Sequence, residues 1–102
     1  MSAKKTYRLR AKVVVWPGEQ GAWHMMHVDT KNSAAIRRAH GMIKRGFGSV
    51  PVVAQIGKTS WETSIFYESR SKTYVLPLKQ KVRGAEGIAE GDGVSFALTI
   101  RT

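Results

Sequence analysis

The chain lacks cysteine altogether, and only seven of its 102 residues are acidic. Without cysteine there is no disulfide framework, and every reaction that needs a thiolate is excluded. No apolar run reaches the ~20 residues of a membrane-spanning helix, and no apolar stretch of signal-peptide type follows Met1. We therefore expect one cytoplasmic domain over residues 1–102, a length that supports a single hydrophobic core.

The shortage of acidic residues leaves a strongly basic chain. Seventeen Lys and Arg stand against seven Asp and Glu, which gives a net charge of +10 with neutral histidines. The imbalance is greatest early in the chain, where Glu19 and Asp29 are the only acids before residue 59. Such a charge attracts polyanions over long distances, and it also keeps a protein soluble whatever its fold. The composition favours nucleic acid or another polyanion as partner, with a merely solubilising surface as the alternative.

Alternating apolar residues predict a mainly β fold. Between residues 7 and 15 the odd positions are apolar, whereas Arg8, Arg10 and Lys12 take the other face, which is typical of a half-buried strand. A turn at residues 17–21 contains Pro and Gly and leads into a second strand. The same alternation places the predicted strands at residues 7–16, 22–28, 50–56, 60–66, 74–76 and 94–100.

The apolar faces of these strands define the expected core. Each of its members lies in phase with the other apolar residues of its own strand. The residues expected to be buried together are Tyr7, Leu9, Val13, Val52, Ala54, Ile56, Trp61, Ile65, Val94, Phe96 and Leu98.

Two short helices are predicted between the strands. The first has Asn32 as its N-cap, an apolar face at three- and four-residue spacing, and Gly41 or Gly46 as its end. The second is predicted over residues 78–83, with Pro77 in its first turn and with Gly84 and Gly87 after it. Each helix follows one strand and precedes another, so the chain divides into two pseudo-symmetric strand-helix-strand halves.

Four motifs in a fixed order carry a resemblance to a known family. They are Val50-Pro-Val-Val-Ala-Gln-Ile-Gly57, Trp61-Glu-Thr-Ser-Ile-Phe66, Leu76-Pro77 followed by Val82-Arg83, and Gly87-Ile88-Ala-Glu-Gly91-Asp92. From residue 7 onward the chain resembles the small bacterial β-barrels known as domain of unknown function 1905. The resemblance implies a closed split β-barrel of about six to eight strands with two short helices, and it implies no activity.

The second half of the chain is also similar to the AbrB-like DNA-binding barrels, in which two short chains build one barrel. Because this chain is about twice as long, it has enough strands to supply both halves itself. We therefore expect a monomer or a weak homodimer.

Ten cations form the candidate nucleic-acid-binding set. Phosphate binding requires cations that follow a backbone, and exposed aromatic rings such as Trp16 and Phe47 would add stacking with unpaired bases. The set comes from the first strand, the first helix region and the second helix: Arg8, Arg10, Lys12, Arg37, Arg38, Lys44, Arg45, Lys79, Lys81 and Arg83.

No combination of residues predicts catalysis, a metal site or a cofactor. Gly57-Lys58-Thr59 lacks the earlier Gly of a phosphate-binding loop, since Val52 stands at that position. His24 and His27 are three apart on a strand, so they point to opposite faces and cannot bind one ion. We expect a non-enzymatic binding module, and the alternative is a barrel that binds a small ligand or peptide in a cleft.

Overall fold

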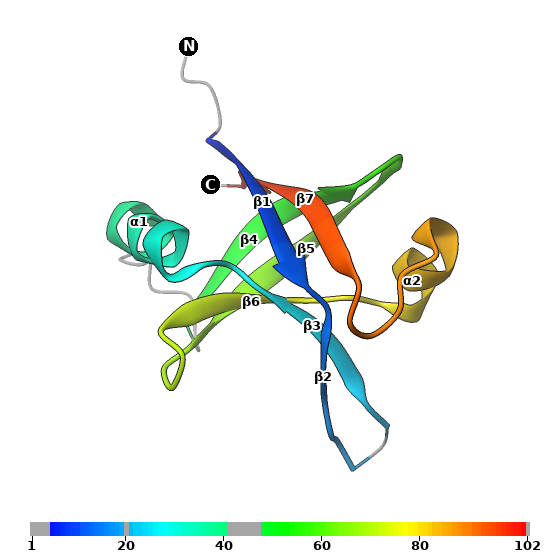
Figure 1. The fold of residues 1–102 in the computed structure, drawn as a ribbon. Coiled ribbons are helices and arrows are strands. Elements are labelled where there is room, and N and C mark those ends of the chain that lie inside the picture. Colours follow the sequence, from blue (N-terminus) through cyan, green and yellow to red (C-terminus); the bar gives the residue numbers. More distant parts are fainter. Residues whose placement is uncertain (1–4, 20, 41–47, 102) are drawn as a thin grey trace.

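The computed structural model describes residues 5–19, 21–40 and 48–101 of the chain, which form a mainly β fold (Figure 1). The elements are β1 (Thr6–Lys12), β2 (Val14–Trp16), β3 (Trp23–His27), α1 (Thr30–His40), β4 (Ser49–Ile56), β5 (Thr59–Glu68), β6 (Thr73–Pro77), α2 (Gln80–Glu86) and β7 (Gly93–Ile100). All seven strands join one antiparallel sheet in the order β1-β7-β4-β5-β6-β3-β2.

The sheet curls around its core, and its two end strands are neighbours in sequence. β1 pairs with β7 at one end, β2 pairs with β3 at the other, and only Val13 separates β1 from β2. The amide of Val13 donates to the carbonyl of Asp92, and its carbonyl accepts the amide of Gly91, both at 2.9 Å. The loop before β7 therefore holds Val13 in place. At this residue the chain passes from β1, at one end of the strand order, to β2, at the other end.

The core lies inside the curled sheet, as the alternation predicts. Its fully buried members include Val52, Ala54, Ile65 and Leu98. Of the predicted core residues, only Leu9 and Trp61 are partly buried, and both pack against the others. Buried positions alternate along β4 and β7, so the two strands present one apolar face each.

α1 begins earlier than predicted, and its cap is Asp29. The carboxylate of Asp29 accepts the backbone amide of Asn32 at 3.0 Å and its side-chain amide at 2.8 Å. Asn32 is therefore a donor to the cap, and its assignment as N-cap was wrong by three residues. Asp and Asn are about equally good N-caps, so local chemistry does not separate the two positions. The predicted helix end at Gly41 or Gly46 lies outside the described residues.

α2 begins later than predicted, because β6 continues through Pro77. Pro77 pairs with Met25 of β3, and the next amide, that of Leu78, donates to the carbonyl of His24 at 2.9 Å. Pro77 thus ends a strand and does not open the helix. Gly84 lies inside α2, where a glycine costs only about 1 kcal/mol. Gly87 is the C-cap, with φ of 65° in the left-handed region that favours glycine.

The pairing pattern relates the two helical crossovers. The segment β3-α1-β4 has the same order of elements as β6-α2-β7. β3 pairs with β6 and β4 pairs with β7, each pair antiparallel. Figure 1 shows α1 and α2 at opposite ends of the curled sheet, left and right in the view, so the cations of the two helices lie far apart.

Candidate nucleic-acid interface

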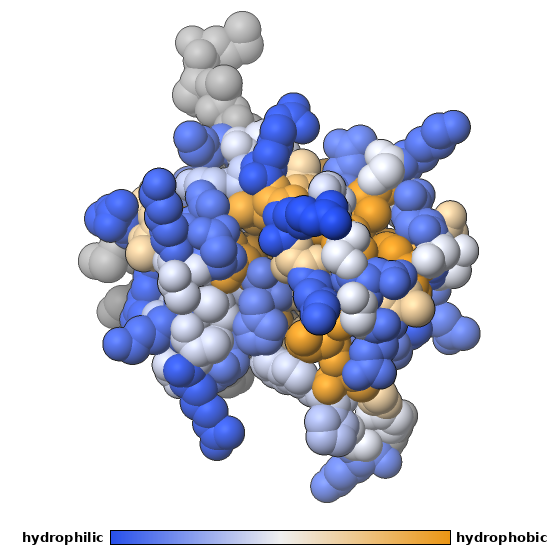
Figure 2. All heavy atoms as spheres, viewed as in Figure 1, coloured by the Kyte–Doolittle hydropathy of each residue, from blue (hydrophilic) through white to orange (hydrophobic). Residues whose placement is uncertain are grey.

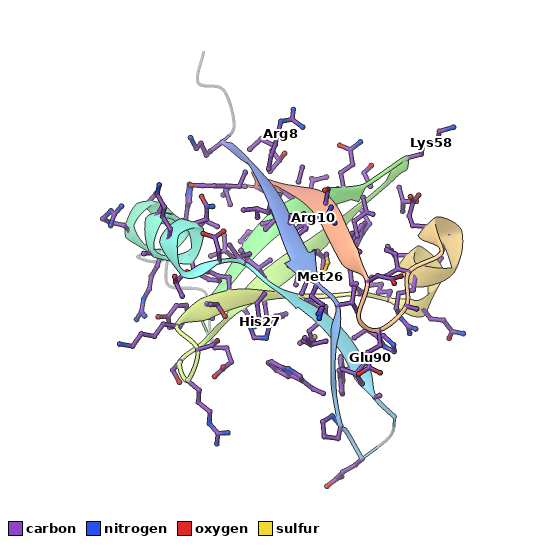
Figure 3. The ribbon with its side chains drawn as sticks, viewed as in Figure 1. Arg8, Arg10, Met26, His27, Lys58 and Glu90 are labelled. Carbon is purple, nitrogen blue, oxygen red and sulfur yellow. The ribbon has the colours of Figure 1, made fainter. Side chains whose placement is uncertain are left out.

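Three cations line the outer face of β1, and we call them the β1 stripe: Arg8, Arg10 and Lys12. All three are exposed and alternate with residues that turn toward the core, as predicted. Nη1 of Arg10 donates to Oγ of Ser95 at 3.2 Å, and its guanidinium lies against Gly93, where a side chain would collide with it. Figure 3 shows Arg8 and Arg10 along this strand, and Figure 2 shows hydrophilic side chains projecting across the same face.

The stripe continues onto α1 through a shallow cleft. Arg8 and Arg38 line this cleft together with Lys5, which lies over the ring of Tyr7 at 5.5 Å. Arg38 also lines a second cleft on the next side of the helix. The structure therefore brings the cations of β1 and α1 together, and it adds Lys5, which the sequence analysis did not select.

This second cleft, the α1 cleft, has a volume of about 470 Å³ and is rich in cations. Its lining comprises Thr30, Ala34, Arg37, Arg38, Ser71 and Lys72, together with Tyr67. The guanidinium of Arg37 lies 4.1 Å from the centroid of the Tyr67 ring, a cation–π contact that fixes its position. Lys72 comes from the β5–β6 turn, so no local pattern on α1 could have predicted its place here.

Carboxylates do not neutralise this surface. In the described part of the chain a single ion pair occurs, between Nη2 of Arg101 and Oε1 of Glu62 at 2.9 Å. The stripe and the cations of the α1 cleft are therefore unpaired within that part. A cation without a carboxylate partner keeps its full charge available to a phosphate.

The cations of α2 lie away from this surface. Lys79, the N-cap of α2, and Lys81 within the helix are exposed, while Arg83 is half-buried and its Nε donates to the carbonyl of Leu78 at 3.3 Å. Lys44 and Arg45, the remaining candidates, lie outside the described residues. The candidate set thus divides into a β1–α1 group and a separate α2 group.

An aromatic groove lies on the outer face of β2, β3, β5 and β6, with a volume of about 360 Å³. Its lining comprises Trp16, Trp23, Met25, Phe66, Val75 and Pro77, together with Tyr67 and Glu68. Trp23 is 59% exposed and Phe66 is 43% exposed. Trp16 was predicted to be exposed, whereas Trp23 and Phe66 were not selected from the sequence. Phe66 is out of phase with the buried Ile65 of its strand, but Trp23 is in phase with Met25, which is buried, so alternation indicates only the first. Phe47 lies outside the described residues.

Comparison with protein families identifies the chain. The family described as domain of unknown function (DUF1905) matches residues 10–98. This chain belongs to the DUF1905 family. The resemblance drawn from the four motifs is thereby confirmed, while comparison with curated proteins gives no match. The matched residues include most of the β1 stripe, the whole α1 cleft and the whole aromatic groove, so these features lie within the DUF1905 domain.

The β5–β6 turn of this DUF1905 domain holds Lys72 in an unusual conformation. Lys72 has φ of 58°, in the left-handed region that non-glycine residues rarely adopt. The carboxylate of Glu68 accepts the amides of Arg70 at 2.7 Å and Ser71 at 3.0 Å. The bond from the Arg70 amide is the main reason that the pKa of Glu68 lies below its ordinary value. The carboxylate of Glu68 therefore organises the turn, and the backbone amides of the turn partly compensate its charge.

The two histidines of β3 lie on opposite faces of the sheet, as predicted. Nδ1 of His27 is 2.8 Å from Oγ1 of Thr73, and the His27 ring lies 5.8 Å from Trp16. Nδ1 of His24 is buried without a hydrogen-bond partner in the described structure. Both imidazoles are partly buried. Over the described ranges, no group of three His, Asp or Glu could hold a metal ion.

The turn at Gly57 is a hairpin turn between β4 and β5, in keeping with the incomplete phosphate-loop pattern at Gly57-Lys58-Thr59. Gly57 has φ of 57°, and strand β5 follows within two residues. The carboxylate of Glu86 on α2 lies against Gly57 and accepts the hydroxyl of Thr59 at 2.6 Å.

Among the described residues, no helix is both long and apolar enough to cross a membrane.

Proposed function

We propose that this DUF1905 protein is a non-enzymatic module that binds nucleic acid through the β1 stripe and the α1 cleft. The observation that carries the proposal is a run of cations from Lys12 to Lys72 that contains no carboxylate partner in the described structure. Binding would proceed by neutralising phosphates and releasing their counterions, which requires no chemical step.

The dimensions of the stripe suit a phosphate backbone. Arg8 and Lys12 are four residues apart on an extended strand, so their Cα atoms are about 14 Å apart at ~3.4 Å per residue. One strand of duplex DNA carries a phosphate about every 3.4 Å along its axis. The stripe therefore extends over roughly four phosphates, and the cleft at Arg38 continues it toward α1.

We also propose that the curled sheet is a closed split barrel of two pseudo-symmetric halves, formed by one cytoplasmic chain as a monomer or weak homodimer. The support is that β1 and β2, the end strands, are separated by Val13 alone. The repeated order β3-α1-β4 and β6-α2-β7 further supports two halves in one chain. Hydrodynamic size and binding stoichiometry test this; a tight dimer or two chains per binding site would contradict it.

A competing function is favoured by the aromatic groove. An apolar cleft with few polar groups is the usual form of a site for a small ligand or peptide. Such a site would bind its ligand with little dependence on salt, whereas phosphate neutralisation depends steeply on it. A salt series therefore separates the two functions.

The decisive experiment measures affinity for a generic duplex DNA across a salt series. We expect non-specific binding at least as tight as about 0.1 mM near physiological salt. Changing Arg8, Arg10 and Lys12 together to Gln should reduce the slope of log affinity against log salt by roughly 2–3, at about 0.9 per phosphate contact. Near physiological salt the melting temperature should change little, because exposed and screened charges contribute little to stability.

The matched control removes three charges elsewhere. Lys58, Lys79 and Lys81 are exposed on the β4–β5 turn and α2, and changing them to Gln leaves the stripe intact. The control should keep most of the wild-type slope. An equal loss in both variants would mean that net charge alone drives binding, and no binding by the wild type would move the small-ligand function ahead.

A further inference from the structure

The aromatic groove and the α1 cleft are adjacent sites that share one residue. Tyr67 lines both of them, and Arg37 lies against its ring on the side of the cleft. The cleft supplies cations and hydroxyls, whereas the groove supplies aromatic and aliphatic surface. Phe66 and Val75 of the groove face the other side of β5 and β6 from the Tyr67 ring, so the two together present an anion site on one face of β5 and a stacking surface on the other, and they meet at Tyr67.

From this juxtaposition we propose that the protein binds single-stranded nucleic acid, with unpaired bases stacked in the aromatic groove and phosphates held in the α1 cleft. The inference rests on the proposed function and specifies its substrate class. In a duplex the faces of the bases are already stacked on one another, so a groove of this kind has nothing to bind. In a single strand each base offers a free face beside a phosphate.

The exposure of the aromatic rings supports this assignment. Trp23 and Phe66 are the large hydrophobic side chains that the described structure leaves exposed. They come from different strands, β3 and β5, and both line the groove. Leaving such residues in water is unfavourable, and contiguous exposed apolar surface commonly marks a binding site. Base–aromatic stacking tolerates any sequence, since every base has a π-face.

The charges around the groove fit a phosphate-bearing ligand better than an apolar peptide. Arg37, Arg38 and Lys72 all line the adjoining cleft, and no carboxylate does. Glu68 is the one acid of the groove, and its oxygens are occupied by the amides of Arg70 and Ser71. Its role is therefore to shape the turn that positions Lys72, at the conformational cost of a left-handed lysine.

The test compares three probes: a 20-nucleotide poly-thymidine strand, an abasic strand of equal length, and a duplex of equal length. Changing Trp23 and Phe66 together to Leu keeps apolar bulk and removes the rings. We expect the variant to bind poly-thymidine about 100-fold more weakly, at roughly tenfold per lost stack. Its affinity for the abasic strand and the duplex, and its salt slope, should equal those of the wild type.

The complementary variant removes charge beside the groove. Changing Arg37 and Lys72 to Gln should lower the salt slope for poly-thymidine by about 1.4, at ~0.7 per contact on a single strand. Circular dichroism should show that each variant is folded. All four replaced side chains, Trp23 and Phe66 in one variant and Arg37 and Lys72 in the other, are exposed, so the core stays intact.

The three probes separate a failure of the stacking inference from a failure of the proposed function. If the Trp23→Leu, Phe66→Leu variant binds poly-thymidine as tightly as the wild type, the stacking inference is overturned, while salt-dependent binding through the β1 stripe stands. An equal loss on the abasic strand or the duplex also overturns it, because the rings would then act without bases. If the wild type binds none of the three probes, the proposed function fails together with the inference.

Discussion

Ser33 shows at the residue scale how one hydroxyl can join two elements. It is fully buried at 0% exposure on the inner face of α1. Its Oγ donates to the carbonyl of Val28 and accepts the amide of Tyr74, both at 3.0 Å. The amide of Val28 in turn donates to the carbonyl of Tyr74 at 2.9 Å. The hydroxyl therefore satisfies a strand amide of β6 that α1 would otherwise leave buried and unpaired.

Replacing Ser33 by Ala should destabilise the protein by about 1–3 kcal/mol, because one buried donor and one buried acceptor lose their partner. Urea unfolding measures the change against a typical total of about 5–15 kcal/mol. Ser69→Ala, at an exposed turn position, is the control and should change stability by less than about 0.5 kcal/mol. Equal free energies of unfolding for the two variants would show that the hydroxyl of Ser33 does not stabilise the fold.

Residue-scale patterns also explain which parts of the site could be predicted. Arg8 and Arg10 were predicted to be exposed because strand alternation is a local property. The same alternation indicates that Phe66 is exposed, because it is out of phase with Ile65, but it does not indicate the exposure of Trp23, because Met25 in the same phase is buried. Lys72 could not be found in this way, because its position beside Arg37 depends on a turn and a helix far apart in the sequence.

At the scale of elements, α1 depends on Asp29 for its start. The carboxylate accepts two hydrogen bonds from Asn32, and the side-chain bond is the first cause that lowers the pKa of Asp29 below its ordinary value. A carboxyl with a lowered pKa in the folded state stabilises the fold above its unfolded pKa of about 4. That contribution is lost as pH falls through the lower, folded value.

Changing Asp29 to Asn should therefore alter the acid limb of the stability profile. Asn still caps a helix, but it cannot titrate. Below about pH 4 the variant protein should therefore lose less stability than the wild-type protein. Urea unfolding at a series of pH values measures the difference between the two proteins. This difference should be largest above about pH 5 and shrink toward acid. Glu68 titrates in both proteins and cancels in the comparison; a difference that stays constant with pH would contradict the prediction.

The helices show why element boundaries were harder to predict than strand phases. Period-two alternation places β4 and β7 almost to the residue. Pro77 suits either the end of a strand or the first turn of a helix, and only its pairing with Met25 on β3 decides between them. The same applies to Val13, where the break between β1 and β2 follows from its bonds to the distant loop at Asp92.

At the scale of the whole molecule, charge and size act together. The chain carries a net charge of +10 within principal extents of 36 × 30 × 22 Å. The Debye length is about 30 Å at 0.01 M salt, so nearly every cation then repels every other; at 0.15 M it is about 8 Å and only neighbours interact. Repulsion between like charges destabilises the compact state.

The melting temperature should therefore rise with sodium chloride between about 0.01 and 0.3 M, the range over which screening removes this long-range repulsion. The variant with Arg8, Arg10 and Lys12 changed to Gln should show a shallower rise, since it carries three fewer cations. A poly-thymidine strand should raise the melting temperature at low salt by binding the folded state. That gain should vanish at high salt as phosphate contacts weaken. Thermal unfolding followed by circular dichroism tests both effects, and a melting temperature that falls or stays level with added salt would show that the cations do not repel one another enough to matter.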